Sequence, residues 1–186
     1  NHALKDFDKV ISIDPDNLAA ITLRAACLGS LGDLQGCING YSDILKFRPN
    51  DRNALSSIGT VFYAIDDFEN SMRYFEKMFK FNNKDSEAVG FRGACKFKLS
   101  DSKGAIEDLD KSLDMLSDNH EYISLFYKIR GEAKADTNDD AGAINDFNKT
   151  IELNPDYADA YCNLGNILKN YGKYEEADAN YIKAIK

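Results

Sequence analysis

The sequence predicts an all-α fold, a solenoid of stacked helix pairs, because three sets of residues recur with one common period. The spacings within each set are multiples of 34 residues, apart from four extra residues between Gly93 and Gly131. Self-similarity at a fixed period of this length is typical of stacked supersecondary units. The sets are prolines, glycines and small residues: Pro15, Pro49 and Pro155; Gly59, Gly93, Gly131 and Gly165; Ala3, Cys37, Ser71, Ala105, Ala143 and Ala177.

The period divides the chain into repeats. Complete repeats are predicted at residues 18–51, 52–85, 86–123 and 124–157, with a second-helix fragment at 1–17 and an incomplete repeat at 158–186. The chain is expected to form one solenoid and to be a section of a longer protein. The four extra residues amount to about one helical turn. We expect them to lengthen the first helix of repeat 124–157, with Ser117-Asp118-Asn119 as the turn and cap before it.

Each complete repeat is predicted to fold as helix, turn, helix. Repeat 52–85 shows the three-and-four spacing of one helix face twice, at Leu55, Ile58, Phe62 and Ile65 and then at Phe68, Met72, Phe75 and Phe79. Dipeptides that end one helix and cap the next lie between the halves of successive repeats, at Gly32-Asp33, Asp66-Asp67, Ser100-Asp101 and Asn138-Asp139.

Small residues are predicted where the two helices of a repeat touch. Glycine in a helix interior costs about 1 kcal/mol of helix propensity, so its recurrence at the eighth position of the first helix indicates close packing. A small residue also recurs at the twentieth position, on the second helix. The bulk of a continuous core is expected from a third position: Phe7, Tyr41, Phe75, Leu109, Phe147 and Tyr181.

These features resemble the tetratricopeptide repeat family. Its pattern runs aromatic, two residues, Leu-Gly, two residues, aromatic, then Ala, three residues, an aromatic and finally Pro. The chain shows Tyr161, Leu164-Gly165, Leu168, Ala177 and Tyr181 in its last repeat, and Tyr127, Gly131, Ala143, Phe147 and Pro155 in the one before. Several positions depart from it, at Ala25, Asn83, Lys96, Ser117 and Lys134. The resemblance implies a right-handed superhelix of antiparallel helix pairs whose concave groove holds an extended peptide.

The composition argues against several classes of protein. With 23 Lys and Arg against 31 Asp and Glu, the 186 residues carry a formal net charge of -8, whereas binding to nucleic acid requires a surplus of cations. No apolar run approaches the roughly 18 residues of a membrane-spanning helix, and no signal peptide is visible. We therefore expect no nucleic-acid partner and no membrane insertion, and the pattern of unpaired cysteines favours the cytoplasm.

Patterns that would indicate catalysis or metal binding are missing from the sequence. There is no Gly-rich phosphate loop and no cluster of His, Cys and carboxylates at metal-ligand spacing. We expect no enzymatic activity, no cofactor and no metal. The four cysteines show no paired short spacing. Cys27, Cys37 and Cys95 are expected to be buried reduced thiols, and Cys162 to be an accessible one.

Arginines and aspartates recur in register, at the seventh and twenty-third positions of the repeats. Internal ion pairs between helices are favoured over a role as ligands for the carboxylate of a partner. The pattern leaves the pairing open. The candidates within repeats are Arg92–Asp108 and Arg130–Asp146, and the candidates between repeats are Arg24–Asp6 and Arg130–Asp108.

The stripe opposite the packed face of each first helix is predicted to line the groove that binds a protein or peptide. Tyr63 and Phe97 occupy the same position in successive repeats and are expected to lie about 10 Å apart, where they could flank an apolar anchor of the ligand. The predicted partner-binding residues are Asn53, Ser56, Thr60, Tyr63, Glu87, Phe97, Lys98, Lys128, Glu132, Asn163 and Asn166.

One subgroup of the family clamps the terminal carboxylate of chaperone tails with Lys and Asn side chains. Lys128 and Asn163 match that clamp, but Glu132 stands where its first Asn belongs and would repel a carboxylate. We therefore expect a protein-interaction scaffold that is not a chaperone-tail receptor. The alternative is self-assembly through the terminal repeats, where Phe7, Ile182 and Ile185 lack complete cover. RNA binding is a third hypothesis, which the period and the negative charge oppose.

Overall fold

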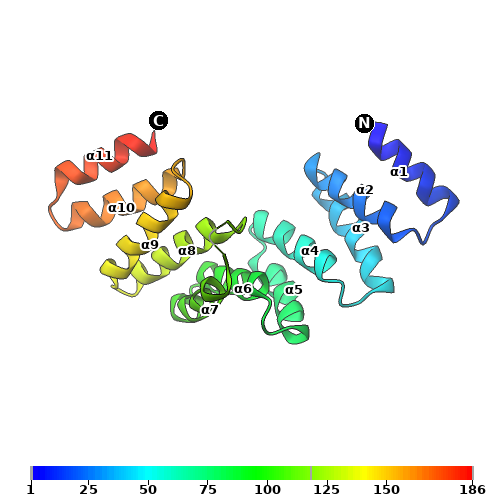
Figure 1. The fold of residues 1–186 in the computed structure, drawn as a ribbon, viewed down its shortest axis with the longest axis horizontal. Coiled ribbons are helices and arrows are strands. Elements are labelled where there is room, and N and C mark those ends of the chain that lie inside the picture. Colours follow the sequence, from blue (N-terminus) through cyan, green and yellow to red (C-terminus); the bar gives the residue numbers. More distant parts are fainter. Residues whose placement is uncertain (1, 118, 186) are drawn as a thin grey trace. The chain divides into compact units, whose positions relative to one another are not determined.

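The computed structural model describes residues 2–117 and 119–185 of the chain, and within them every regular element is an α-helix (Figure 1). The helices are α1 (His2–Ile13), α2 (Leu18–Ser30), α3 (Leu34–Phe47), α4 (Arg52–Ala64), α5 (Phe68–Phe81), α6 (Ser86–Lys98), α7 (Ser102–Met115), α8 (Ile123–Asp136), α9 (Asp140–Leu153), α10 (Ala158–Asn170) and α11 (Tyr174–Ala184). The predicted all-α solenoid of helix pairs is confirmed.

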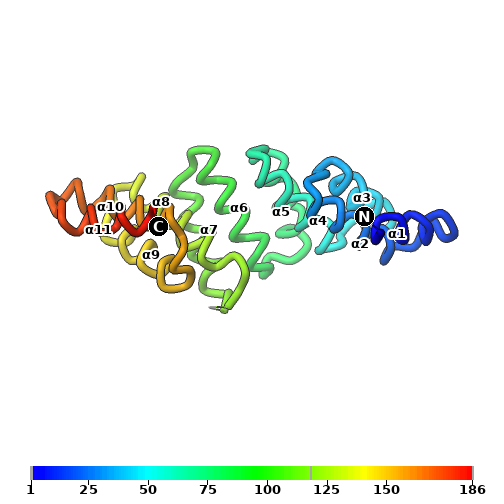
Figure 2. The backbone as a smooth tube through the Cα atoms, turned by 90° about the horizontal axis from the view of Figure 1, so that it is seen from above, coloured from blue at the N-terminus to red at the C-terminus, as the bar shows by residue number. Residues whose placement is uncertain are grey.

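The chain forms two compact units. The first unit covers residues 1–83 and contains α1 to α5, and the second covers residues 84–186 and contains α6 to α11. Within each unit every helix packs against the next one along the chain, as Figures 1 and 2 show. In the second unit α6 also contacts α8.

Each unit has its own apolar core. In the first unit buried side chains of α2, α3 and α4 form one cluster, which contains Ile21, Ala25, Cys37, Tyr41, Ile44, Ala54 and Ile58. In the second unit α9, α10 and α11 contribute Ala143, Phe147, Leu164, Ile167, Leu168 and Ala177. Burial of this apolar surface is the main driving force that holds the helix pairs together.

The turns inside the helix pairs have the structure that the dipeptides predict. The first residue of each has a positive φ, 83° at Gly32, 60° at Asp66, 68° at Ser100 and 65° at Asn138. The second is an aspartate whose carboxylate accepts a hydrogen bond from the backbone N–H three residues later, at Gly36, Asn70, Gly104 and Gly142. The left-handed residue ends one helix, and the aspartate caps the next.

The recurrent glycines lie where the sequence predicts close packing. A Cβ atom built on Gly59 would stand 2.7 Å from the Phe75 ring, and one built on Gly131 would stand 2.8 Å from the Phe147 ring. Real Cβ atoms do not approach other heavy atoms so closely. The small residues of the twentieth position are also buried, at Cys37, Ser71, Ala105, Ala143 and Ala177. The prediction that small residues let the paired helices approach is therefore confirmed.

The four-residue insertion lies in a loop, and the predicted extension of the first helix of repeat 124–157 is wrong. Helix α7 ends at Met115, and α8 begins only at Ile123 and has 14 residues, against 13 in α6 and α10. The predicted turn of Ser117 to Asn119 is partly outside the described residues, because Asp118 is not described.

The aromatic ring of Tyr122 explains why α8 does not begin earlier. Its centroid lies 4.8 Å from that of Phe91 in an edge-on arrangement, which holds the residue before the helix against α6. The preceding loop is closed by backbone hydrogen bonds from the N–H of His120 to Ser117 and from the N–H of Ile123 to His120. The contact with Phe91 thus holds Tyr122 as the residue that precedes α8.

Candidate functional site

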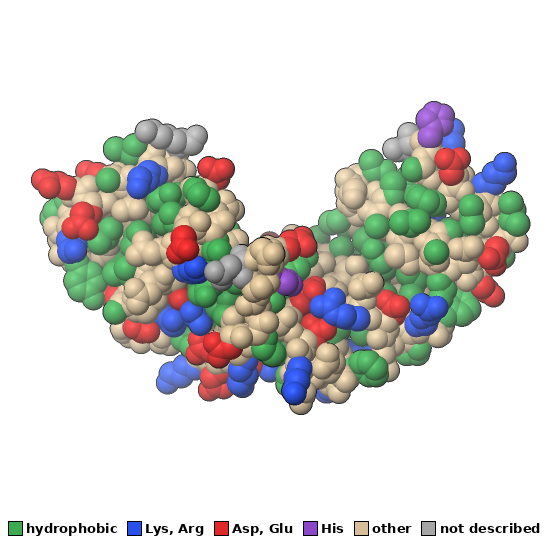
Figure 3. Space-filling view, in the orientation of Figure 1, with side chains coloured by type: hydrophobic (Ala, Val, Ile, Leu, Met, Phe, Trp, Pro, Cys, Tyr) green, Lys and Arg blue, Asp and Glu red, His purple; other side chains and the backbone are tan. Residues whose placement is uncertain are grey.

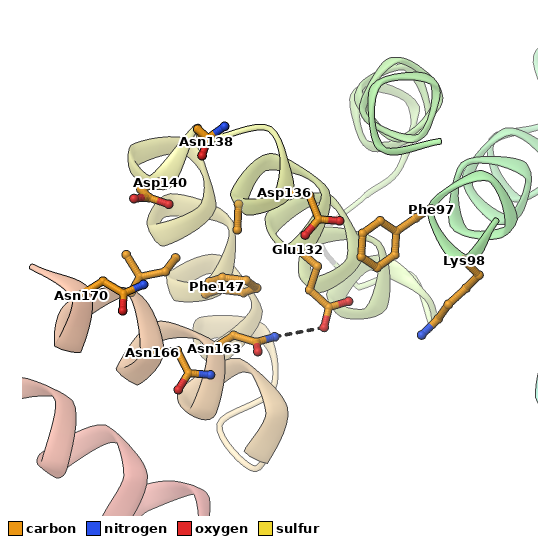
Figure 4. Close-up of a pocket in the computed structure, with 12 residues that line it drawn as sticks. Phe97, Lys98, Glu132, Asp136, Asn138, Asp140, Phe147, Asn163, Asn166 and Asn170 are labelled. Carbon is orange, nitrogen blue, oxygen red and sulfur yellow. Dashed lines mark hydrogen bonds between the residues drawn. The ribbon is translucent and has the colours of Figure 1, made fainter. Parts of the chain in front are cut away.

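A cavity of about 540 Å³ lies in the second unit, between α6, α8, α9 and α10 (Figure 4). We call it the second-unit cavity. It brings together five of the predicted partner-binding residues, Phe97 and Lys98 from α6, Glu132 from α8, and Asn163 and Asn166 from α10. The other lining residues are Ala135, Asp136, Asn138, Asp140, Phe147, Ile167 and Asn170.

Glu132 is held in the cavity wall by two neighbouring side chains. Its Oε1 accepts a hydrogen bond of 3.0 Å from Nδ2 of Asn163 and lies 2.8 Å from Nζ of Lys128. The other oxygen, Oε2, is buried and makes no hydrogen bond within the described chain. Lys128 also lies 3.8 Å from Asp159, and its side chain is only 12% exposed. The ammonium group of Lys128 is therefore engaged in an internal ion pair.

Two asparagines on α10 present opposite hydrogen-bonding groups to the cavity. A carboxylate only accepts, so Asn163 must turn its NH₂ group toward Glu132, which leaves its Oδ1 as an acceptor. Asn166 is held the other way round, since its Oδ1 accepts a hydrogen bond of 2.8 Å from the Tyr181 hydroxyl. Its Nδ2 remains as a donor. Because the two residues are three apart on one helix, donor and acceptor lie on the same face.

Two more carboxylates line the cavity where α8 ends and α9 begins. Asp136 accepts a hydrogen bond of 3.1 Å from the Ser102 hydroxyl, and Asp140 accepts one of 3.0 Å from the Tyr171 hydroxyl. The hydrogen bond to Asp140 and the negative charge of that residue raise the pKa of Tyr171. Neither aspartate forms an ion pair with another described residue.

The predicted residues of the first unit all lie on α4. Asn53 is exposed, and Ser56, Thr60 and Tyr63 are partly exposed. The Thr60 hydroxyl donates within its own helix to the carbonyl groups of Ser56 and Ser57. The Tyr63 ring packs edge-on against Phe68 with centroids 5.4 Å apart. The expected pairing of Tyr63 with Phe97 would join residues of different units and stays a prediction.

Glu87 differs from the other predicted site residues because it is buried, at 7% exposure, and does not line the cavity. The Tyr122 side chain lies near it. Burial, together with the negative charges of Glu121 and Glu87, raises the pKa of Tyr122 to about 12. Gly90, one turn later on the same stripe, would bring a Cβ atom against the Phe126 ring. Gly90 therefore faces the packed interior of the second unit.

Arg92 and Arg130 form the internal ion pairs expected within repeats. Nε and Nη2 of Arg92 donate to the Asp108 carboxylate at 2.7 and 2.6 Å. Arg130 binds Asp146 in the same way, at 2.8 and 2.6 Å. The two pairs suggested between repeats are wrong. Arg130 contacts Asp110 at 2.8 Å instead of Asp108, and Arg24 contacts Asp8 at 2.6 Å instead of Asp6.

The sequence analysis missed the lysines that complete these clusters. Lys96 lies 2.8 Å from Asp108, and Lys134 lies 2.9 Å from Asp146. Burial alone would raise the pKa of Asp108, but hydrogen bonds from Arg92 and Lys96 outweigh it and hold this pKa below its usual range. In both clusters the lysine follows the arginine by four residues, and the aspartate follows the arginine by sixteen residues and the lysine by twelve. This repeated spacing could have revealed both clusters.

The cysteines are the other residues for which the sequence raised a chemical role. The cysteines form no disulfide in the part of the chain described. Cys37 and Cys95 are buried, whereas Cys27 and Cys162 are half-buried, so the expected burial of Cys27 is only partial.

Residues 2–117 and 119–185 contain no group of three His, Cys, Asp or Glu side chains that could hold a metal ion. No helix there is long and apolar enough to cross a membrane. In Figure 3 acidic and basic side chains are interspersed on the surface of each unit.

The family model that matches this chain is described as TPR repeat and covers residues 131–172. No curated protein sequence matches. Among solved structures, MamA is 22% identical with a TM-score of 0.70 over 87% of this chain and 92% of that chain. YrrB, "a TPR protein with an unusual peptide-binding site", is 21% identical with a TM-score of 0.70 over 96% and 90%.

A third structure, the APC/C hetero-tetramer Cut9–Hcn1, is 15% identical with a TM-score of 0.86. The match covers 98% of this chain and 36% of that chain. At these identities the likeness to solved structures establishes the fold of the chain.

Proposed function

We propose that this chain, which matches the TPR repeat model over residues 131–172, is a non-enzymatic protein-interaction scaffold that binds an extended segment of a partner protein in its second-unit cavity. The observation that carries this proposal is the opposite polarity of Asn163 and Asn166. Every residue of an extended peptide offers one N–H and one C=O group. The acceptor on Asn163 and the donor on Asn166 match this pair whatever side chains the ligand carries.

Apolar side chains of the cavity support the same function. Phe147 and Ile167 are 1% and 6% exposed and form part of its inner wall, and the partly buried Phe97 lies on the α6 side. A side chain of the bound segment that covers the partly exposed Phe97 ring would remove apolar surface from water. Ligand sites commonly combine such surfaces with a few well-placed polar groups. The likeness to YrrB, whose structure is described by its peptide-binding site, also favours a peptide ligand.

Peptide selection followed by affinity measurement tests this function. A phage-displayed library of random 12-residue peptides is selected on the full chain, and the winning peptides are synthesised and titrated calorimetrically. The double variant Asn163→Ala, Asn166→Ala should weaken binding about tenfold, because two hydrogen bonds to the backbone are lost. The matched control is Asn145→Ala, Asn148→Ala, a pair of exposed asparagines with the same spacing on α9.

The control variant should bind the peptides as tightly as the unchanged protein. Two results would refute the proposed function. In the first, selection yields no peptide that binds the folded protein. In the second, the winning peptides bind the Asn163→Ala, Asn166→Ala variant with unchanged affinity, which would place their site elsewhere on the chain.

Self-assembly is the second candidate, and exposed apolar side chains favour it. Ile182 is 51% exposed and Ile185 is 85% exposed in the second unit, and Ile13 is 76% exposed in the first. Light scattering across a hundredfold range of concentration tests this candidate. A mass that rises with concentration, and that falls again in the variant Ile182→Lys, Ile185→Lys, would support self-assembly. A constant monomer mass would exclude it for this chain.

A further inference from the structure

Negative charge dominates the lining of the second-unit cavity. Glu132, Asp136 and Asp140 contribute carboxylates, against the one ammonium group of Lys98 among the described lining residues. Lys128 lies 2.8 Å from Glu132 and compensates it. Among the described residues, Asp136 and Asp140 accept hydrogen bonds only from the neutral hydroxyl groups of Ser102 and Tyr171. Two negative charges therefore stay without a cationic partner in the described part of the chain.

The Glu132 carboxylate gives a second, independent indication of a missing donor. Its Oε2 is buried and accepts no hydrogen bond from the described residues. Leaving a buried acceptor unsatisfied is unfavourable, and such atoms are rare in folded proteins. Figure 4 shows the Glu132 side chain in the wall of the cavity, between Phe97 and Asn163. A ligand that brought an N–H donor to this place would satisfy the acceptor.

An aromatic ring completes the arrangement. Phe97 extends from α6 toward the cavity wall on which α8 carries Glu132 and Asp136, one helical turn apart (Figure 4). The aliphatic stem of a lysine or arginine can cover such a ring while its charged end lies among carboxylates. The ring face also attracts a cation directly. An acidic side chain at the same place would be repelled by the uncompensated carboxylates.

We infer that the second-unit cavity selects a partner segment that carries a cationic side chain, lysine or arginine, whose stem packs on Phe97 and whose charge lies between Glu132 and Asp136. This inference rests on the function proposed above and adds the chemical class of the ligand. Glu132 and Asp136 are the specificity-determining residues, and Asp140 contributes long-range attraction. The asparagines bind the backbone of the segment and do not read its charge.

The same 12-residue peptide library tests this inference. Peptides selected on the unchanged protein should be enriched in lysine or arginine at one position relative to the unselected library. The best peptide is then compared with a version in which that residue is replaced by citrulline, for arginine, or by acetyl-lysine, for lysine, which removes the charge and keeps the stem. This replacement should weaken binding to the unchanged protein about five- to tenfold.

Variants of the protein then locate the effect. In the double variant Glu132→Gln, Asp136→Asn the charged and uncharged peptides should bind with nearly equal affinity. The control Glu107→Gln, Asp114→Asn changes the net charge equally at exposed positions of α7 and should keep the full preference. Circular dichroism at 222 nm checks that each variant is folded.

The outcomes separate this inference from the function on which it rests. Winning peptides without a basic residue, bound in an Asn163- and Asn166-dependent way, would overturn the cationic ligand and leave the scaffold function standing. A preference for the charged peptide that persists in the Glu132→Gln, Asp136→Asn variant would overturn the assignment of these two residues. Selection without any binding peptide would refute the scaffold function itself.

Discussion

Arg130 binds Asp146 through two hydrogen bonds, from Nε to Oδ2 at 2.8 Å and from Nη2 to Oδ1 at 2.6 Å, and so joins α8 to α9. Lys134 adds a third contact to the same carboxylate at 2.9 Å. The Asp146 side chain is 4% exposed, whereas those of Arg130 and Lys134 are 15% and 17% exposed. The cluster is an ionic substitute for apolar packing inside a helix pair.

The equivalent positions of repeat 52–85 are apolar or aromatic. They hold Ile58, Phe62 and Tyr74, and the rings of Phe62 and Tyr74 stack with centroids 5.7 Å apart. The same structural place is thus filled by an aromatic stack in one repeat and by a charged cluster in another. The lysine at 134 replaces the family's usual aromatic without loss of contact between the helices.

Asp146→Asn should lower the free energy of unfolding of the second unit by about 2–3 kcal/mol, less than for a fully buried pair because both cations are partly exposed. Urea denaturation followed by circular dichroism measures it. The matched control is the triple variant Arg130→Ile, Lys134→Phe, Asp146→Tyr, which copies the aromatic stack. That variant should come within about 1–2 kcal/mol of the unchanged protein, since apolar packing can replace a buried ionic cluster. Equal destabilisation by both variants would contradict this explanation.

Stability should fall with pH below about 4 because of Asp108. Its pKa is lower in the folded protein than the value of about 3.9 for an unfolded aspartate. The unfolded chain therefore takes up the proton first, and stability that is fully present above pH 4 is lost as the pH falls toward the folded pKa. Urea titrations at pH 7, 5, 4 and 3 measure this loss. Asp108→Asn should be less stable at pH 7 and should show a shallower loss below pH 4; an unchanged acid slope would rule out this origin.

Gly131→Ala should destabilise the second unit although alanine favours helices. The gain in helix propensity is about 1 kcal/mol, but the new Cβ atom would lie 2.8 Å from the buried Phe147 ring. We expect a net loss of about 1–3 kcal/mol in thermal or urea unfolding, as for other overpacked cores. Adding Phe147→Leu should make the Gly131→Ala change less harmful than it is alone. A stabilising effect of Gly131→Ala would show that the helices do not approach as closely as described.

The cysteines should react with a thiol reagent in an order set by burial. Cys27 and Cys162 are half-buried, and Cys37 and Cys95 are buried. Burial also raises the pKa of Cys37, which lowers the fraction of reactive thiolate at a given pH. Mass spectrometry after labelling of the native protein at pH 8 should find Cys27 and Cys162 modified first. Modification of Cys37 at the same rate as Cys162 would be inconsistent with the packing between α2 and α3.

The sequence was sufficient for the parts of the fold that depend on local patterns. The period, the apolar spacing and the aspartate after each turn predict the helix pairs, and the recurrence of small residues predicts where the paired helices approach. The place of the insertion depends instead on Tyr122, whose ring contacts Phe91, a residue far away in the sequence. No local pattern contains that information.

The sequence also predicted only some of the residues that line the candidate site. Helix periodicity was enough to select Phe97, Glu132 and Asn166, and the resemblance to the chaperone-tail clamp selected Asn163; the structure brings all four to one cavity. The burial of Glu87 and the engagement of Lys128 with Glu132 depend on which neighbouring side chains reach them. Asp136 and Asp140 were missed because they flank a turn, outside the helical stripe from which the groove was predicted.

Nuclear magnetic resonance with a selected peptide tests the central claim most directly. In a titration of the isotope-labelled full chain, the account predicts that the side-chain amides of Asn163 and Asn166 and the ring of Phe97 show the largest shift changes. Asn145 and Asn148, on the exposed face of α9, should remain unchanged. Shift changes centred on Asn145 and Asn148, with the cavity residues unaffected, would contradict the account.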